Sequence, residues 1–206
     1  MRGYQREWYF MITLGKKLEK EDTAYVLDYL PYGRSDDTRP MYQKKPLVQG
    51  VGEKHFVLME MAPKENVAPT SQDRVYIGEG DRPVIDHVRR RITFNDLTHG
   101  AQMELPVMIE KIVLAKESRF LSFFNEAYPI TTRLHMLELL PGIGKKLMWG
   151  IIEEKKKGAF ASFKALVERV KGLHSPEKLI AHRVIDELKD ENIKYRIFTT
   201  PMPPKR

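Results

Sequence analysis

The chain has 206 residues, of which 42% are hydrophobic and 31% charged, so it can form one large domain or two small ones with real hydrophobic cores. It contains no cysteine, which excludes disulfides and thiolate metal sites and favours a reducing compartment. No apolar run approaches the roughly 20 residues that a membrane span needs, and Met1–Phe10 lacks the apolar core of a signal peptide. We therefore expect a cytoplasmic protein with no membrane partner.

The net charge of +7 is concentrated in one part of the sequence. Residues 1–130 hold 19 Lys and Arg against 19 Asp and Glu, whereas residues 131–206 hold 16 against 9. A concentrated positive field favours a polyanionic partner. The alternative interpretation is a lysine-rich, solvated surface with no specific partner.

The first half of the chain predicts a small β-domain. Five strand-like segments alternate with loops that contain Pro and Gly, and no helical period appears before about residue 95. These segments are 23–30, 47–52, 55–62, 74–78 and 84–94. Five short strands of this kind fit a partly closed OB-like barrel. Met1–Lys20, before them, has no clear pattern.

The long loop after the first predicted strand is a candidate contact for nucleic acid. Tyr32–Pro46 combines basic and aromatic side chains, which suit phosphate contact and base stacking. Its candidate binding residues are Arg34, Arg39, Lys44 and Lys45. A mobile, solvated loop is the alternative, and the sequence of this loop alone favours it.

The second half of the chain is helical, and a short glycine-containing stretch divides it. Apolar residues at helical spacing predict helices over Thr131–Leu140 and Lys145–Lys157. Between them, Pro141 disfavours helical angles at the preceding residue and so ends the first helix. Gly142 and Gly144 permit tight turns and close approaches, and the apolar Ile143 between them is expected to be buried against both helices.

This stretch has the properties of an anion site. A helix that begins at a glycine leaves backbone N–H groups free in its first turn, and the helix dipole adds positive charge there. A phosphate oxygen could reach these amides past Gly142 and Gly144, with Lys145 and Lys146 beside it. An ordinary turn between packed helices is the alternative. The glycine spacing argues against a P-loop, because Lys146 occupies the position at which Ser or Thr would hold magnesium.

The same stretch resembles the helix-hairpin-helix motif, which binds nucleic-acid backbone without reading bases. The motif runs apolar, any residue, Gly, apolar, Gly, often Lys; here it is Leu140, Pro141, Gly142, Ile143, Gly144 and Lys145. The resemblance also implies that a sodium or potassium ion could sit on hairpin carbonyls, in this sequence those of Glu138, Leu140 and Ile143. We expect no other cofactor.

A second helix–glycine–helix pattern follows thirty residues later, with Gly172 in the place of Gly142. Ser175 and Pro176 provide the cap and first position of its second helix. The pattern resembles the tandem arrangement in which two hairpins pack as a pseudo-symmetric pair. The second copy has Leu173-His174 where Ile143-Gly144 stood, so Gly172 is a weaker candidate for phosphate binding and the copy could serve mainly to support the first.

A longer resemblance covers about residues 18–200. Its clearest segments are Tyr25–Arg34, Val75–Gly78 and Phe123–His135, the last of which leads directly into the hairpin. They resemble an archaeal family of unknown function that joins an OB-like half to a tandem helix-hairpin-helix half. Members are usually labelled nucleotide- or RNA-binding from this domain content, so the resemblance supports the architecture more than any activity.

No active site is apparent in the sequence. The six histidines are scattered, with none at metal-ligand spacing. Some glycosylases carry this hairpin with a catalytic Asp about twenty residues later, but here there is no Asp between Pro141 and Ile185. Glu153 and Glu154 point to different helix faces, and no serine lies in a nucleophile context. We therefore predict no catalytic residues.

Together these observations predict an α+β protein with four segments. They are an OB-like barrel (1–98), a helical connector (99–128), a tandem helix-hairpin-helix domain (129–192) and a C-terminal tail (193–206). The expected function is non-enzymatic, largely sequence-independent binding of DNA or RNA backbone. The alternatives are a protein–protein adaptor, with Trp8–Phe10 and Phe120–Phe124 as contact surfaces, and an accessory subunit of a nucleic-acid-processing enzyme.

Overall fold

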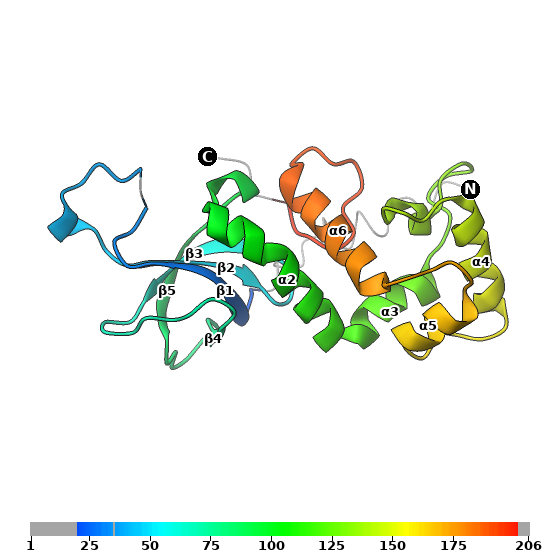
Figure 1. Cartoon of the computed structure of the whole chain (residues 1–206), viewed down its shortest axis with the longest axis horizontal. Helices are drawn as coiled ribbons and strands as arrows, with labels where there is room; N and C mark the ends of the chain where they lie inside the picture. The colour runs from blue at the N-terminus through cyan, green and yellow to red at the C-terminus, as the bar shows by residue number, and fades with distance from the viewer. Residues whose placement is uncertain (1–19, 35, 202–206) are drawn as a thin grey trace. The chain divides into compact units, whose positions relative to one another are not determined.

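The computed structural model of the chain describes residues 20–34 and 36–201 (Figure 1). The predictions for residues 1–19, including the adaptor surface at Trp8–Phe10, and for the end of the tail at residues 202–206 lie outside the described residues. Five strands are followed by five α-helices in the described chain, so the α+β class is confirmed. Contacts divide these residues into two units, 109–186 and 20–108 with 187–201, with divisions inside α2 and α6.

The first unit along the chain is built on an antiparallel half-barrel. Its strands are β1 (Thr23–Leu30), β2 (Leu47–Gly52), β3 (Leu58–Pro63), β4 (Arg74–Tyr76) and β5 (Ile85–Arg91). They are ordered β4-β1-β2-β3-β5. Within the described residues β4 and β5 pair with β1 and β3 but not with each other, so the barrel stays partly open, as the sequence predicted.

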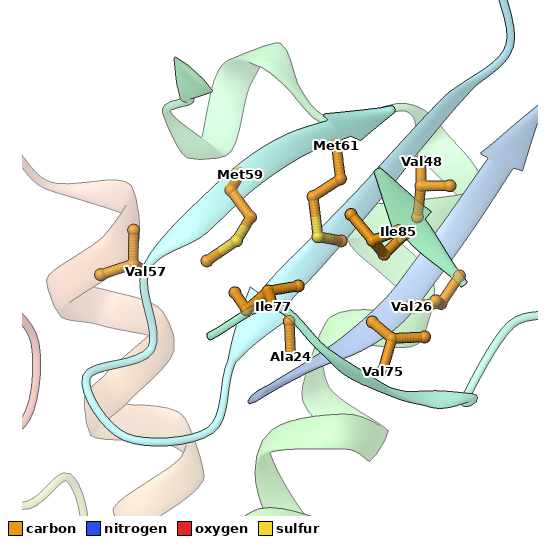
Figure 2. Close-up of a cluster of buried hydrophobic side chains, with 9 residues drawn as sticks. All are labelled: Ala24, Val26, Val48, Val57, Met59, Met61, Val75, Ile77 and Ile85. Carbon is orange, nitrogen blue, oxygen red and sulfur yellow. The ribbon is translucent and has the colours of Figure 1, made fainter. Parts of the chain in front are cut away.

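One face of this sheet encloses the barrel core. Figure 2 shows the nine buried side chains that meet there, contributed by all five strands and the segments next to them. They are Ala24, Val26, Val48, Val57, Met59, Met61, Val75, Ile77 and Ile85. Alternation along β1 and β3 places these residues on one side of the sheet, which is why five short strands suffice for a core.

The third strand begins three residues later than predicted. Phe56 has a positive φ of 53°, which is incompatible with an extended strand. The buried carboxylate of Glu21 accepts hydrogen bonds from the amides of Lys54 and His55, both at 2.7 Å. These amides are therefore committed to a turn and cannot join the β2–β3 ladder.

The opposite face of the sheet carries a row of polar residues. Asp28, Gln49, Glu60 and Arg90 lie in register across β1, β2, β3 and β5. Thr98, just before α2 (His99–Ala115), donates its hydroxyl to Asp28 at 2.5 Å and its amide to Gln49 Oε1 at 2.8 Å. The row therefore fixes the start of α2 on the sheet through hydrogen bonds.

The remaining elements are helical. After α3 (Glu117–Glu126) come a short 3-10 helix η3 (Met136–Leu139), α4 (Lys145–Lys156), α5 (Phe163–Arg169) and α6 (Pro176–Lys189). Phe120, Phe123 and Phe124 on α3 are buried, and the rings of Phe124 and Phe163 meet edge to face with centroids 6.4 Å apart. These aromatic side chains therefore pack in the interior of the helical unit. None of the described helices is long and apolar enough to cross a bilayer.

Residues 195–200 form no strand. The carboxylate of Glu187 accepts hydrogen bonds from the amides of Ile197, Phe198 and Thr199 at 2.7–3.1 Å. The Thr199 hydroxyl donates to the same carboxylate at 2.9 Å. The amides that a strand would offer to a neighbour are thus bound to one side chain.

Candidate nucleic-acid interface

The approach to the first hairpin is not the α-helix that the sequence predicted over Thr131–Leu140. Only Met136–Leu139 is helical, as the 3-10 helix η3. The Thr131 hydroxyl accepts the amides of Arg133 and Leu134 at 3.2 and 3.0 Å, so it closes a turn instead of capping a helix. β-Branched residues such as Thr131 and Thr132 have low helix propensity, and threonine hydroxyls compete for backbone partners, which explains the difference.

His135 caps η3. Its Nδ1 accepts the amide of Leu137 at 3.2 Å, and its own amide donates to the carboxylate of Glu138 at 2.9 Å, so the two residues form a reciprocal capping box. Burial lowers the pKa of His135, so the ring is neutral near pH 7. His135 is therefore a buried residue that caps η3.

The glycines of the first hairpin have different tasks. Gly142 is exposed with a positive φ of 88°, the left-handed conformation that glycine adopts at low cost, and its neighbour Ile143 is buried as predicted. The amide of Ile143 donates to the carbonyl of Leu140 at 3.1 Å and closes the turn. Gly144, also exposed, is the N-cap of α4 and supplies no side-chain cap. The first-turn amides of α4 therefore begin at an open surface.

Two lysines stand at the positive end of α4, where a helix ordinarily favours acidic residues. Lys145 Nζ donates to the carboxylate of Glu138 and to the carbonyl of Arg133, both at 2.8 Å. The hydrogen bond from Lys145, followed by that from the His135 amide, lowers the pKa of Glu138. Lys146 is exposed, and its amino group has no ion-pair partner in the described chain. An anion at this helix end would relieve the unfavourable charge arrangement.

The second hairpin repeats the backbone of the first. Gly172, between α5 and α6, has a φ of 90°, and the amide of Leu173 donates to the carbonyl of Val170 at 3.1 Å. A methyl group on Gly142 would lie 3.6 Å from Leu179 Cδ2 of α6, and one on Gly172 would lie 3.6 Å from Leu147 Cδ2 of α4. Each hairpin glycine thus faces the second helix of the other hairpin, which is the pseudo-symmetry expected of a tandem pair.

This symmetry predicts equal stability effects at the two glycines. Gly142→Ala and Gly172→Ala should each lower the free energy of unfolding by about 1–2 kcal/mol, because alanine is strained at positive φ. Urea denaturation of both variants is the measurement, and Gly80→Ala, at a φ of 103° in the half-barrel with open space around it, is a control for strain without the helix contact. A large difference between the two hairpin variants would contradict the symmetric packing.

The second hairpin differs where the first would hold phosphate. Leu147 and Leu179 make equivalent contacts, so they occupy corresponding positions in the two hairpins. By the same correspondence, Glu177 stands at the position of Lys145 and Lys178 at the position of Lys146. Pro176, at the start of α6, has no amide to offer, and Glu177 would repel a phosphate. Gly172 therefore has the backbone conformation of Gly142 but lacks the full set of amides and the first lysine that accompany Gly142. This agrees with the weaker match of the second hairpin to the sequence motif.

The barrel loop presents fewer available cations than its sequence suggested. The Arg34 guanidinium donates to Asp36 and to the buried Glu60, and its hydrogen bonds to these carboxylates raise its pKa. Arg39 binds Asp37 at 2.6 Å. The amino groups of Lys44 and Lys45 have no hydrogen bond or ion pair within the described residues. Tyr42, 83% exposed, lies beside them, so these are the loop residues best placed to meet a ligand.

The carbonyls considered for a monovalent ion lie along the same turn. The carbonyl of Leu140 accepts the amide of Ile143 and keeps one lone pair. The monovalent ion at the carbonyls of Glu138, Leu140 and Ile143 stays a prediction. Among the described residues, no cluster of three His, Asp or Glu side chains could hold a metal.

One feature beside the hairpin was missed from the sequence. A cavity of about 670 Å³ lies between α4 and the segment that leads into η3, and Lys145 is part of its wall. Trp149, one helical turn after Lys145, also lines it and is 56% exposed. The helical spacing of four residues could have indicated the face of α4 that lines the cavity: Lys145, Trp149, Ile152 and Lys156. The opposite wall of the cavity could not be predicted, because it depends on the non-helical path of residues 127–135.

The fold and hairpins define an OB-like half-barrel joined to a tandem helix-hairpin-helix domain. The profile of a family described as "Protein of unknown function (DUF655)" matches residues 20–200, and the chain belongs to this family. It is 51% identical over 179 residues to the uncharacterized protein MJ0038 of Methanocaldococcus jannaschii, covering 86% of this chain and 79% of that protein. The crystal structure of Af1531 from Archaeoglobus fulgidus matches with 50% identity and a TM-score of 0.83, over 87% of this chain and all of that one. Both relatives are archaeal, in agreement with the resemblance.

Proposed function

We propose that this chain is a non-enzymatic nucleic-acid-binding protein that holds the phosphate backbone at its first hairpin. The observation that carries the proposal is the start of α4, where exposed Gly142 and Gly144 leave the first-turn amides open and Lys145 and Lys146 add positive charge. Backbone amides and a helix dipole of this kind bind phosphate oxygens in many proteins. Because amides contact neither base edges nor the sugar, the binding is expected to be sequence-tolerant and common to DNA and RNA.

The barrel loop would add a second contact through Lys44, Lys45 and Tyr42. Basic and aromatic side chains together suit a single strand, through phosphate pairing and base stacking. Arg34 and Arg39 contribute less to this contact because carboxylates of the same chain already bind them.

The experiment is a salt titration of binding to duplex DNA, single-stranded DNA and structured RNA of equal length. If three or four phosphates are neutralised, log K should fall with log salt at a slope of about −3. Lys146→Glu should weaken binding and reduce the magnitude of this slope by about 1. Lys146 is the informative residue, because replacing Lys145 would also disturb its contact with Glu138.

The matched control is Lys178→Glu, the same charge reversal at the corresponding position of the second hairpin. It should leave affinity and salt slope close to those of the native protein. Equal weakening by both changes would show a diffuse charge effect and not a hairpin site. Native-like binding by Lys146→Glu would make the hairpin a structural turn.

Two other functions remain as proposals with their own tests. For an adaptor, Phe120–Phe124 is ruled out as a surface by burial, so a stable partner recovered after nuclease treatment would have to contact another face. For an undetected nuclease or an accessory subunit of a processing enzyme, cleavage of labelled DNA or RNA by the purified chain with magnesium would be the supporting result.

A further inference from the structure

The cavity beside the first hairpin has the composition of a binding site for a nucleobase. Its wall combines apolar side chains, among them Phe124, Leu137 and Met148, with the aromatic side chain of Trp149, which is 56% exposed. Its volume of about 670 Å³ is typical of small-molecule pockets, which are mostly apolar with a few convergent polar groups. An aromatic side chain at the edge of such a cavity can stack on any base.

The charged groups of the cavity are all cationic. Arg133, Lys145, Lys155 and Lys156 line it, and no Asp or Glu does so in the described chain. The guanidinium of Arg133 makes no hydrogen bond or ion pair with any described residue, whereas Lys155 donates to the carbonyl of Ala127 and Lys156 to Glu153. A planar guanidinium can bind phosphate in bidentate fashion or stack on a base. The wall therefore complements an anionic ligand that has a flat aromatic part.

His135 adds a directional polar group to this wall. It is 92% buried, since 8% of its surface is exposed, and it is neutral near pH 7 because burial lowers its pKa. Its Nδ1 already accepts the Leu137 amide, so the ring proton is on Nε2. Nε2 has no hydrogen-bond partner in the described part of the chain and is a donor available to a base edge.

Lys145 connects the cavity with the hairpin. It stands in the first turn of α4, beside the proposed phosphate contact, and its amino group bonds to the carbonyl of Arg133 on the opposite wall. Trp149 follows on the same face of α4, about 6 Å along the helix axis. A nucleotide whose phosphate meets the hairpin amides could thus place its base, or that of its neighbour, against Trp149.

We infer that this cavity takes an unpaired nucleobase, and that the substrate class is nucleic acid with unpaired nucleotides next to the bound phosphate backbone. This inference rests on the proposed function, because the hairpin supplies the phosphate contact that brings the base to the cavity. Base pairing would hide the base face and edges, so a fully paired blunt duplex uses the hairpin alone.

The test compares three ligands: a blunt duplex, the same duplex with a short thymidine tail, and the same duplex with a tail of abasic nucleotides. The abasic tail keeps the phosphates and removes the bases. The native protein should bind the thymidine tail roughly tenfold more tightly than the abasic tail, given the usual strength of base–aromatic stacking. DNA and RNA versions of each ligand are measured at one salt concentration.

Trp149→Ala should remove the difference between the two tails and leave blunt-duplex affinity unchanged, and Trp149→Phe should retain part of it. Leu114→Ala is the control, because Leu114 has the same 56% exposure as Trp149 but does not line the cavity. In a Trp8→Phe background Trp149 is the only tryptophan, and its fluorescence should be quenched by the thymidine tail and not by the abasic one.

The outcomes separate the two proposals. Equal affinity for the thymidine and abasic tails, or an unchanged preference in Trp149→Ala, overturns the base-binding cavity while leaving hairpin binding intact. Failure to bind any of the ligands overturns both. Both proposals are supported if the preference for the thymidine tail depends on Trp149 and if Lys146→Glu lowers the affinity for all three ligands.

Discussion

Replacing Glu187 by alanine is expected to lower the free energy of unfolding by about 3–5 kcal/mol, because buried donors left without an acceptor are among the costliest point changes. Glu187 is fully buried, with 0% of its surface exposed. Its carboxylate accepts three backbone amides and one hydroxyl from Ile197–Thr199. Alanine would leave all four donors unpaired. Urea denaturation gives the measurement.

Asp186→Ala is the matched control, since it removes the same charge from the preceding, exposed position of α6. It should change the free energy of unfolding by no more than about 0.5 kcal/mol. Glu187→Gln keeps one acceptor oxygen, so its loss in the free energy of unfolding should lie between those of Glu187→Ala and Asp186→Ala. If Glu187→Ala lowered the free energy of unfolding by less than about 1 kcal/mol, the amides of residues 197–199 would have found other hydrogen-bond acceptors, and the prediction would be wrong.

The sequence predicted the parts of the hairpin that depend on local chemistry. A left-handed backbone at Gly142, a buried Ile143 and a helix beginning at Lys145 follow from glycine's freedom, apolar spacing and the lack of a side chain at the cap. The repeat at Gly172 was visible for the same reason. The path of Thr131–Leu134 was not predictable. The helix expected there rested on the spacing of three leucines, but the Thr131 hydroxyl binds the backbone amides of the next residues and closes a turn instead.

Partners far apart in the sequence were also not predictable. Arg34 was a nucleic-acid candidate because it lies in a basic, aromatic loop, but its guanidinium binds Glu60, 26 residues away on β3. Nothing near Arg34 in the sequence indicates that partner. The cavity was missed for a similar reason: its walls, α4 and residues 127–135, are recognisable only after both have folded.

Arg34 and Glu60 should show a coupling of about 1–3 kcal/mol in a double-mutant cycle for stability. Glu60 is 4% exposed, and it accepts Arg34 Nη1 at 3.0 Å and Arg90 Nε at 2.8 Å. Glu60→Ala alone should lower the free energy of unfolding by about 2–3 kcal/mol. This is less than the usual loss for breaking a buried ion pair, because Arg34 and Arg90 both reach solvent and stay hydrated without Glu60. Arg34→Ala, Glu60→Ala and the double variant are compared by urea denaturation.

The Arg39–Asp37 pair supplies the control cycle, because it lies in the same loop but at the surface, where ion pairs contribute little to stability. A strong coupling for Arg34 and a negligible one for Arg39 would establish Arg34 as the residue that fixes the start of the loop to the sheet. Lys44 and Lys45 would then hold the loop's available charge. If Arg34 showed no coupling and its loss instead reduced the salt slope of binding, the guanidinium would leave Glu60 for phosphate, and the barrel loop would be a mobile part of the interface.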